Sequence, residues 1–456
     1  MIRFNEKSLK DWLNSYGRKP VIIRGARQVG KSTLVRMFAK NAGLDLVEIN
    51  LEKYLFMNEI FKTFDIPLIL RELEGIAGKS FNERSLLFLD EIQAVPNALA
   101  CLRYFYEEKK ELPVISAGSL LEFTLSEHSY SMPVGRADYR YLGPMSFNEF
   151  IYNLYPELNK YISSLNEVKT MPDTAHKKLT EKFREYLFIG GMPEAVLAYK
   201  ETGSLESVKT VHRSICDTYL DDFAKYGKKS KELLLLQKLF RAIPQNIGDK
   251  VKYSNLSKEH KSGEVKSAVE MLIKARICNP VYGSDCSGIP LKATENRDVY
   301  KLMFLDVGLV NHITGLDINS LNSIDADSLI NKGRIAEQFV SQHLINSEDM
   351  TRPSDLNYWL RENKKGNAEV DFVTEIGGKI IPVEVKSGKS GSLKSLHQFI
   401  ALKKNIKYAV RFDLNKYSSQ TVSYNVIIEG REEAEVEFVL ESYPVYASGL
   451  LTDIKV

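Results

Sequence analysis

The feature that most constrains this chain is a glycine-containing loop near its amino terminus, placed between an apolar stretch and a helical one. Residues Pro20 to Thr33 read PVIIRGARQVGKST, and Val21 to Arg24 within them is typical of a buried parallel strand. The residues from Gly25 to Ser32 match the pattern G-x-x-x-x-G-K-[ST] at every fixed position. A helix is predicted from Ser32 to Lys40, so the loop has the strand and helix that it requires. We therefore predict a parallel α/β sheet here.

The residue types of this loop suit a bound triphosphate. Gly25 and Gly30 allow successive amide N–H groups to point into one concavity, and the following helix adds the positive end of its dipole. We expect Lys31 to reach the β- and γ-phosphates of ATP, Ser32 to ligand Mg²⁺, and Arg27 and Gln28 to point outward. The predicted nucleotide-binding residues are Gly25, Ala26, Arg27, Gln28, Val29, Gly30, Lys31, Ser32 and Thr33.

Two carboxylates end a later apolar stretch. After a strand predicted from Leu44 to Leu51, the residues from Ser85 to Glu91 read SLLFLDE. Asp90 is a candidate Mg²⁺ ligand, and Glu91 is a candidate catalytic base that polarises the attacking water. The alternative is a strand end that is acidic because it reaches the surface.

Two more candidates follow the strand predicted from Leu112 to Ala117. Ser119 suits a hydrogen bond to the γ-phosphate or to the attacking water, although Gly-Ser is also a common turn. Arg136 is a candidate catalytic residue that stabilises charge on the transferring phosphoryl group. It could act within its own chain or on a neighbouring subunit, which leaves a homo-oligomer open, or it could be a surface residue.

The length and composition predict several soluble domains. A chain of 456 residues is too long for one core. We predict four domains, one at 1–150 that contains the glycine loop and three more at 151–228, 229–320 and 321–456. No apolar run reaches the roughly 18 residues of a membrane helix, and the first residues lack an apolar signal core. A cytoplasmic protein with no membrane partner is expected.

The cysteines are expected to be reduced and buried. Their positions show no C-x-x-C spacing, so neither a disulfide framework nor a structural zinc site is predicted. They are Cys101, Cys216, Cys278 and Cys286.

Basic residues are concentrated in the middle of the chain. Lys225 to Arg276 holds thirteen Lys or Arg against five Asp or Glu, although the whole chain has a formal net charge of only +3. Helices predicted at Leu233–Ala242, Tyr253–His260 and Gly263–Ala275 precede a hairpin at Ile277–Leu305, which is a winged-helix order. Such a module commonly places its third helix in a DNA groove and its basic side chains on phosphates. The alternatives are a solvated surface or a protein partner.

Four chemistry-bearing residues are spread over the last quarter of the chain. Glu337 lies in a helix predicted from Asn331 to Leu344. Asp371 and Glu384 lie in neighbouring strands, Ala368–Thr374 and Ile380–Lys386, that follow a strand at Leu356–Leu360 and precede a helix at Leu393–Leu402. Asp371 and Glu384 could share a Mg²⁺ ion that activates water against a phosphodiester.

Lys386 is expected to assist them. It lies two residues from Glu384, hence on the same strand face, where it could orient the nucleophile or neutralise developing charge. Glu337 could complete the metal shell, so all four are candidate catalytic residues. The alternative is a set of solvated charges on a fold kept for binding.

Taken together, these motifs resemble prokaryotic AAA+ type ATPases that pair an ATPase domain with a C-terminal domain of unknown function. The segments that carry the resemblance are GARQVGKSTL, LLFLDEIQ, the GS after the next strand, VGRADYRYLGPMSFNEF and GGMPEAVLAY, and it extends over the whole chain. It implies a sheet ordered 5-1-4-3-2 and a helical lid. Asn50 resembles the polar residue that restrains the catalytic glutamate in such proteins.

The last domain resembles the PD-(D/E)xK nucleases at Glu337, Asp371, Glu384 and Lys386. It departs from them at Val370, where that family has proline. The leading hypothesis is a Mg-ATPase whose nucleotide state repositions a basic winged helix and a metal-dependent nuclease-like domain on DNA. The alternative is a regulatory switch that binds a protein or nucleic acid without cleaving it.

Overall fold

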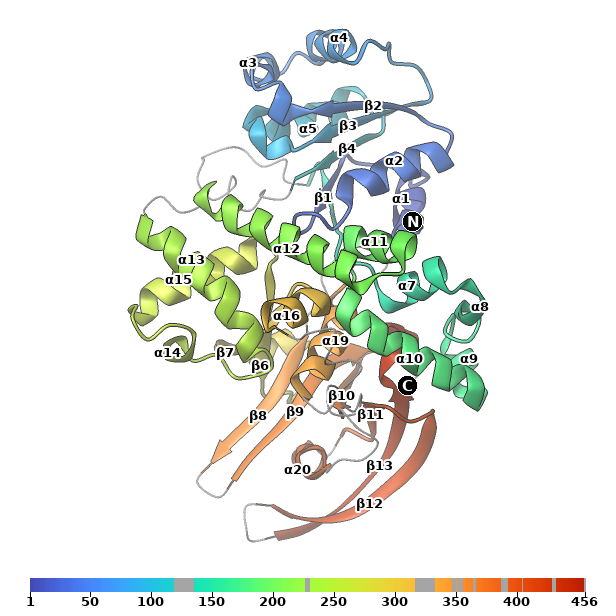
Figure 1. Cartoon of the computed structure of the whole chain (residues 1–456), viewed down its shortest axis with the longest axis vertical. Helices are drawn as coiled ribbons and strands as arrows, with labels where there is room; N and C mark the ends of the chain where they lie inside the picture. The colour runs from blue at the N-terminus through green and yellow to red at the C-terminus, as the bar shows by residue number, and fades with distance from the viewer. Residues whose placement is uncertain are drawn as a thin grey trace.

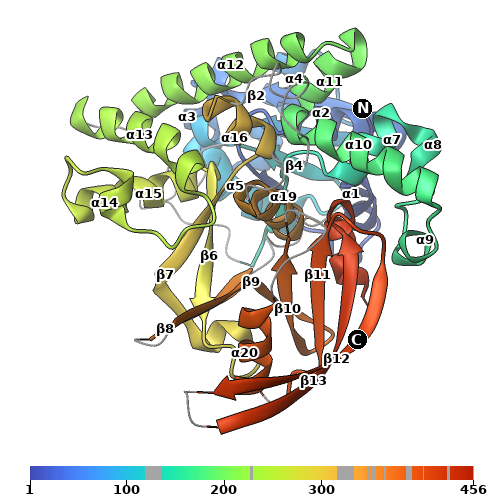
Figure 2. The same ribbon diagram turned by 60° about the horizontal axis from the view of Figure 1, so that its bottom comes forward.

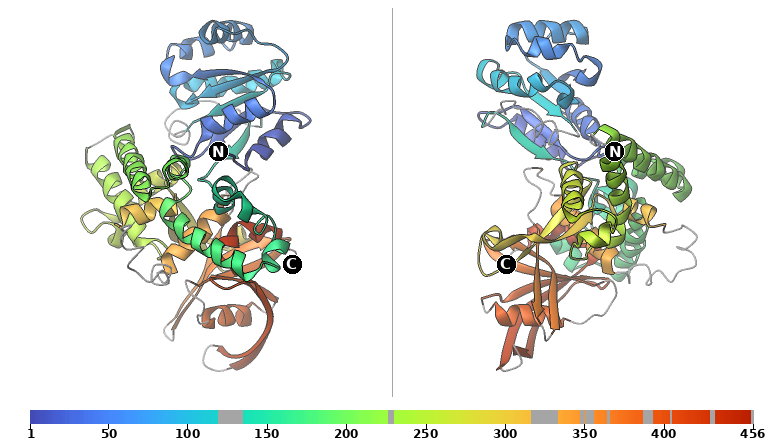
Figure 3. Two further views of the ribbon diagram at one scale, coloured as in Figure 1. Left: turned by 45° about the vertical axis from the view of Figure 1, so that its right-hand side comes forward. Right: turned by 90° about the vertical axis from the view of Figure 1, so that its left-hand side faces the viewer.

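The computed structural model describes residues 1–118, 135–225, 230–315, 333–346, 350, 356–363, 366–386, 393–403, 405–428 and 432–454. These residues form two β-sheets at opposite ends of the molecule, with helices between them (Figure 1). Figure 3 shows the same separation from two further sides. The nucleotide loop and the predicted nuclease-like residues therefore belong to different sheets.

The amino-terminal sheet has the strand order β2-β3-β4-β1-β5, and its neighbouring strands are parallel. This confirms the expected order. The strands are β1 (Val21–Arg24), β2 (Asp45–Asn50), β3 (Ser85–Asp90), β4 (Val114–Ala117) and β5 (Asp138–Tyr141). Side chains of β3 alternate between two cores, with Leu86 and Phe88 in one and Leu87 and Leu89 in the other. Both faces of the sheet are therefore buried, as an apolar parallel strand requires.

Helices cover the two faces. One face packs on α1 (Glu6–Leu13) and α2 (Lys31–Asn41), and the other on α3 (Met57–Phe61), α4 (Ile66–Ala77) and α5 (Pro96–Glu108). Short 3₁₀ turns, η1 (Leu51–Lys53) and η2 (Ile92–Ala94), follow β2 and β3. The turn η2 begins directly after Glu91, so it helps to place that carboxylate.

A helical segment follows the first sheet. It contains α7 (Phe147–Leu154), α8 (Pro156–Asn159), α9 (Leu165–Lys169), α10 (Asp173–Ile189), α11 (Pro193–Thr202), α12 (Leu205–Asp222) and η3 (Phe223–Lys225). The break between α10 and α11 needs glycine, because Gly190 has a φ of 68° and a Cβ there would lie 2.1 Å from Asp306 Oδ1. The expected helix break at the two glycines is confirmed.

The basic segment forms the helices α13 (Ser230–Ala242), α14 (Tyr253–Leu256) and α15 (Ser262–Lys274), with η4 (Ile243–Asn246) after the first. The second is shorter than predicted and ends at Leu256 because Ser257 is already extended. The hairpin β6 (Cys278–Ser284) and β7 (Glu295–Phe304) follows, with η5 (Leu291–Thr294) between its strands. The hairpin predicted at Ile277–Leu305 is therefore present.

The remaining residues add α16 (Val307–Ile313), α19 (Gly333–Ile345), β8 (Asn357–Asn363), β9 (Gly366–Ile376), β10 (Lys379–Val385), α20 (Lys394–Leu402), β11 (Tyr408–Asp413), β12 (Ser418–Ile428), β13 (Glu432–Pro444) and η6 (Val445–Asp453). A mixed sheet joins these strands in the order β12-β13-β11-β10-β9-β8-β6-β7 (Figure 2). The hairpin β6–β7 enters it through parallel pairing of Tyr282 with Asn357 and of Gly283 with Tyr358. The hairpin and the carboxy-terminal strands therefore share one sheet.

All four cysteines are free and buried, as expected. Among the residues that the structure describes, no helix combines the length and the apolar character that crossing a membrane requires.

Candidate functional site

The phosphate loop is shaped by its glycines. It runs from the end of β1 to the start of α2, and Gly30 takes a φ of 91° as the residue that caps α2. Gly25 has a φ of 155°, and a Cβ there would lie 2.2 Å from the carbonyl oxygen of Leu142. Only glycine fits either position, as the sequence pattern indicates.

Lys31 and Ser32 lie at the start of α2. Lys31 is 8% exposed. Its Nζ donates to the carbonyl oxygens of Gly25 at 3.0 Å and Ala26 at 2.8 Å, which holds the ammonium group across the loop. The Ser32 hydroxyl donates to Asp90 Oδ2 at 2.8 Å. Burial raises the pKa of Asp90, and the hydrogen bond from Ser32 opposes that rise. A hydroxyl beside a carboxylate is a donor set that suits Mg²⁺.

Glu91 is held by its own turn. It takes a φ of 51° before η2, and Gln93 Nε2 donates to its Oε2 at 2.5 Å. Asn50, the residue that the family resemblance assigned to this restraint, instead accepts from Glu52 N at 3.0 Å and caps η1. In the described residues the restraint on Glu91 therefore comes from Gln93, which corrects the expectation for Asn50.

A cavity of about 470 Å³ surrounds this site, a size typical of pockets for small ligands. Its wall combines the loop and α2 with Glu91, the amino-terminal segment and the start of α11. The lining residues are Met1, Arg3, Arg27, Gln28, Gly30, Lys31, Ser32, Thr33, Leu34, Arg36, Met37, Glu91, Met145, Pro193, Glu194 and Leu197. The sheet and the helical segment thus enclose the loop together.

Arg27 does not point freely outward as expected. Its Nε lies 2.6 Å from Oδ2 of the buried Asp222 on α12, and the Tyr219 hydroxyl donates to its carbonyl oxygen at 2.8 Å. Gln28 also departs from the expectation, because it lines the cavity. The middle of the loop is therefore tied to the last turn of α12.

Arg3 is a site residue that the sequence reasoning missed. It is buried, its Nη1 donates to the carbonyl oxygen of Val29 at 2.9 Å, and its Nε lies 3.0 Å from Glu149 Oε1. It thereby connects the loop to α7. No sequence motif marks an arginine in this position. The burial of its charge is a property that only the structure shows.

Arg136 lies away from the loop of its own chain. It precedes β5, whose Asp138 pairs with Val21 at the start of β1, whereas the phosphate loop follows the end of β1. Its Nε lies 3.1 Å from Glu107 Oε1. A role on a neighbouring subunit stays a prediction. Ser119 lies outside the described residues.

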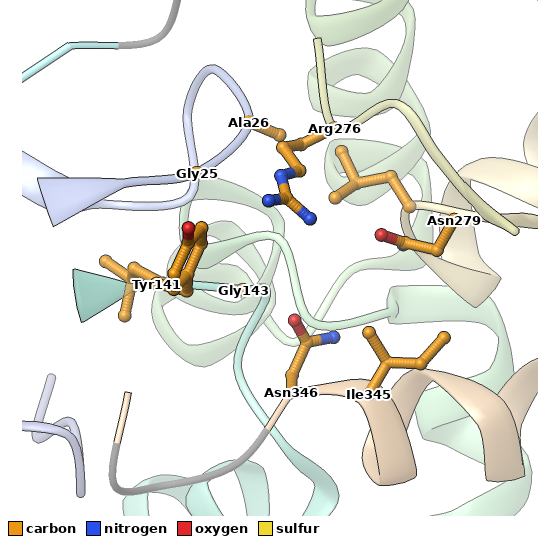
Figure 4. A pocket seen from close by; sticks show the side chains of 10 residues that line it. Gly25, Ala26, Tyr141, Gly143, Arg276, Asn279, Ile345 and Asn346 are labelled. Carbon is orange, nitrogen blue, oxygen red and sulfur yellow. The ribbon is translucent and has the colours of Figure 1, made fainter. Parts of the chain in front are cut away.

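A second, much smaller cavity of about 30 Å³ lies behind the loop (Figure 4). Its wall includes Gly25 of the loop, Tyr141 at the end of β5, Arg276 after α15 and Asn346 after α19. The guanidinium of Arg276 lies 4.9 Å from the centre of the Tyr141 ring. The basic helices and α19 therefore both reach the base of the phosphate loop.

The structure brings together the four residues predicted in the last domain. Lys386 forms an ion pair with Glu384, and Val385 N donates to Asp371 Oδ2 at 2.7 Å. Burial raises the pKa of Glu384 to about 8, with a further rise from the charges of Asp371 and Glu337. Burial likewise raises the pKa of Glu337 to about 8. We call this set, with the two residues added below, the acid–lysine cluster.

Two members of the cluster were not predicted. Lys301 on β7 is fully buried, with its Nζ 3.6 Å from Glu337 Oε2 and in an ion pair with Glu369 on β9. Burial opposes the charge of Lys301, but the charges of Glu337, Glu369 and Asp371 outweigh it and raise its pKa. A lysine inside the apolar run YKLMF was the available signal.

We compared the cluster with the expected Mg²⁺ site at Asp371 and Glu384, which Glu337 was expected to complete. No group of three or more His, Cys, Asp or Glu among the described residues is placed to hold a metal ion. Oε2 of Glu384 has no hydrogen-bond partner there, and that residue is 4% exposed. A buried carboxylate oxygen without a partner fits a cation at Asp371 and Glu384.

Comparison with known families divides the chain into three segments. Residues 17–151 match the family described as an AAA domain. Residues 180–320 and 332–429 match two families, each described as a domain of unknown function. No curated protein matches the sequence. The amino-terminal segment, which holds the phosphate loop, is therefore similar to the AAA domain family.

The chain is also similar to several solved structures. The Walker-type ATPase of Pyrococcus abyssi has 17% identity and a TM-score of 0.42, over 68% of this chain and 94% of that one. The ORC2 protein of Aeropyrum pernix in its ADPNP–ADP complexes has 12% identity and a TM-score of 0.36, over 68% and 91%. DnaA of Aquifex aeolicus bound to AMPPCP has 15% identity and a TM-score of 0.25, over 58% and 86%. Similarities at these TM-scores support no conclusion about this chain.

Proposed function

We propose that the AAA domain binds ATP with Mg²⁺ and hydrolyses it. The observation that carries this proposal is the placement of Lys31, Ser32 and Glu91 in the wall of one cavity of about 470 Å³, with Asp90 accepting the hydrogen bond of Ser32. Each of the four has a side chain whose chemistry suits one part of phosphoryl transfer to water.

Binding and chemistry divide between these residues. Lys31 moves from the carbonyl oxygens of its own loop to the phosphates, and the loop amides complete the anion site. Ser32 and Asp90 would hold the Mg²⁺, which neutralises charge on the phosphates when bound. Glu91, oriented by Gln93, accepts the proton of the attacking water.

The test separates binding from hydrolysis. Glu91→Gln should keep its affinity for a fluorescent ATP analogue and lose phosphate release about 100-fold or more, because a positioned base contributes roughly 10²–10⁴ in rate. Lys31→Ala should lose the binding itself. Glu59→Gln, which changes an exposed carboxylate on α3, is the matched control. Undiminished phosphate release by Glu91→Gln would refute the assignment.

A second proposal is that the segment from α13 to β7 is a winged helix that binds duplex DNA. It is supported by the element order and by exposed basic side chains on α13 and α15 and in the segments beside α14, namely Lys231, Arg241, Lys252, Lys258, Lys261, Lys266 and Lys274. Contacts of this kind neutralise phosphates and release counterions, so affinity should fall steeply with salt.

Charge reversal tests the DNA proposal. The triple change Lys258→Glu, Lys261→Glu and Lys266→Glu should weaken duplex binding at least tenfold and flatten its salt dependence, measured by fluorescence anisotropy. A triple change of lysines exposed on the AAA domain, Lys53, Lys62 and Lys79, is the control. An equal loss of duplex affinity in both triple variants would indicate non-specific electrostatic attraction and would contradict a DNA-binding role for the segment from α13 to β7.

The third proposal is that the acid–lysine cluster cleaves DNA with one divalent ion held by Asp371 and Glu384. Plasmid incubated with Mn²⁺ and ATP should be nicked, and Lys386→Ala and Asp371→Asn should each abolish nicking. The regulatory alternative predicts ATP-dependent DNA binding, no nicking by the unmodified protein and unchanged binding by Asp371→Asn. Nicking that survives in Lys386→Ala would remove that residue from the site.

A further inference from the structure

Lys301 on the hairpin β6–β7 is a charged residue at a buried position of the sheet, where apolar side chains are usual. Lys301 lies on β7 opposite Val281 of β6, and its neighbour Leu302 is buried as well. Its side chain has no exposed surface. Burying an ammonium group without partners is strongly unfavourable, so the residues around Lys301 must compensate its charge.

Two carboxylates from separate elements meet this ammonium group. Glu337 comes from α19, with Oε2 3.6 Å from Nζ, and Glu369 comes from β9 and forms an ion pair with it. The centre of the Tyr358 ring on β8 lies 4.9 Å from the same Nζ. Lys301 is thus surrounded by groups that favour a cation.

The ion pairs of the acid–lysine cluster are unevenly distributed over its carboxylates. Lys301 pairs with Glu337 and Glu369, and Lys386 pairs with Glu384, so among the described residues Asp371 is the member of the cluster that forms no ion pair. Oε2 of Glu384 has no hydrogen-bond partner in the described residues, and Lys386 pairs with the other oxygen, Oε1.

We propose that Lys301 is the internal cation of this cluster. Its ammonium group occupies the position that a second divalent ion would take beside Glu337 and Glu369, so the cluster accepts one metal ion, at Asp371 and Glu384. Glu337 then pairs with Lys301 and is not a metal ligand. The metal ion itself rests on the third proposed function, whereas the role of Lys301 does not.

A second consequence concerns the hairpin. The same hairpin belongs to the proposed DNA-binding segment and supplies the charge that completes the acid–lysine cluster. Lys301 can therefore complete the cluster only when β7 is packed so that its side chain reaches Glu337 and Glu369.

Manganese binding tests the proposal without any cleavage assay. Free Mn²⁺ is titrated by electron paramagnetic resonance against nucleotide-free full-length protein in an Asp90→Asn background, which silences the phosphate-loop site. Lys301→Met should bind one Mn²⁺ more than the parent, and this extra ion should disappear in Lys301→Met/Glu369→Gln. Lys379→Met, which changes an exposed lysine on the neighbouring strand β10, should bind as the parent does.

The outcomes separate the two proposals. A parent that binds no Mn²⁺, together with a Lys301→Met variant that binds one, would support the internal cation and refute the metal at Asp371 and Glu384. Equal stoichiometry and affinity in the parent and in Lys301→Met would overturn the role of Lys301. Two ions bound by the parent in this background would overturn it as well.

If Lys301→Met folds too poorly for a metal titration, its melting temperature tests whether Lys301 stabilises the carboxylates around it. Lys301→Met should lower the melting temperature by several degrees, because the carboxylates of Glu337, Glu369 and Asp371 then lose the cation that stabilises their charges. Adding Glu337→Gln and Glu369→Gln should recover most of that loss. A triple variant no more stable than Lys301→Met would show that Lys301 does not act through these carboxylates.

Discussion

At the scale of single residues, Asp306 shows how much this molecule depends on one buried carboxylate. It has no exposed surface and accepts hydrogen bonds from Gly191 N at 2.6 Å, Leu309 N at 3.1 Å and Gln342 Nε2 at 3.1 Å. These donors come from the break before α11, from α16 and from α19. The carboxylate therefore joins the helical segment beside the nucleotide cavity to the carboxy-terminal half.

The ionisation of Asp306 predicts a pH effect on stability. Burial raises its pKa to about 6, above the ordinary value of 3.8. The folded protein therefore holds this proton at pH values where the unfolded chain has released it. The free energy of unfolding should fall by up to about 3 kcal/mol as the pH rises from about 4 to about 6, and this component should then level off.

Asp306→Asn isolates that component. Asparagine does not titrate, so urea unfolding at a series of pH values should show a shallower fall for the variant than for the parent. The variant should also be less stable near neutral pH by about 1–3 kcal/mol, because an amide N–H₂ would face a backbone N–H that needs an acceptor. Identical pH slopes in both proteins would contradict the assignment.

At the scale of elements, α12 is tied directly to the phosphate loop. Asp222 and Tyr219 in its last two turns contact Arg27, and the chain continues from there through η3 towards the basic helices. A loop held in its binding shape loses less conformational freedom when a ligand arrives. The ion pair between Arg27 and Asp222 should therefore support nucleotide affinity.

Asp222→Asn is expected to weaken ATP binding about 5- to 10-fold, which corresponds to roughly 1 kcal/mol of added ordering. The rate of hydrolysis at saturating ATP should change little, because Glu91 and Asp90 are untouched. Asp217→Asn, an exposed carboxylate on the same helix, is the control. Titration of a fluorescent analogue measures the effect. A lower saturating rate with unchanged affinity would instead place Asp222 in the chemical step.

The elements that the sequence could predict are those whose signal is local. The order strand, glycine loop, helix around Lys31 follows from residue types within fourteen positions, and the run SLLFLDE marks its own strand. The ion pair of Lys386 with Glu384 follows from strand alternation, which puts side chains two residues apart on one face. In each case the residues that determine the geometry are neighbours in the chain.

What the sequence could not predict depends on distant contacts. Arg3, Asp222 and Lys301 act through partners more than a hundred residues away or on another element, and no local pattern encodes such pairs. Arg136 was assigned by its motif, but only the register of β5 against β1 shows which end of the sheet it occupies. The long hairpin of β12 and β13 was missed for a related reason, since its polar, charged face hides the strand pattern.

At the scale of the whole molecule, the carboxy-terminal half is held together across the predicted boundary between residues 320 and 321. The parallel pairing of β6 with β8 spans it. So does Gln338 on α19, whose amide donates to the carbonyl oxygen of Phe304 and accepts from its N–H, both at 2.8 Å. With the ion pairs of Lys301, three kinds of buried contact connect the two sides.

These contacts predict the behaviour of a cut chain. A specific protease site inserted between residues 320 and 321 of the full-length protein should be cleaved without separating the two pieces, because the shared sheet and the buried polar contacts stay in place. The pieces should elute as one species in size-exclusion chromatography, also in 1 M salt, since buried pairs are screened far less than exposed ones. The same insertion carrying Lys301→Met should release the pieces at a lower urea concentration, with Lys379→Met as the control. Pieces that elute separately in buffer alone would show that 229–320 and 321–456 are independent domains.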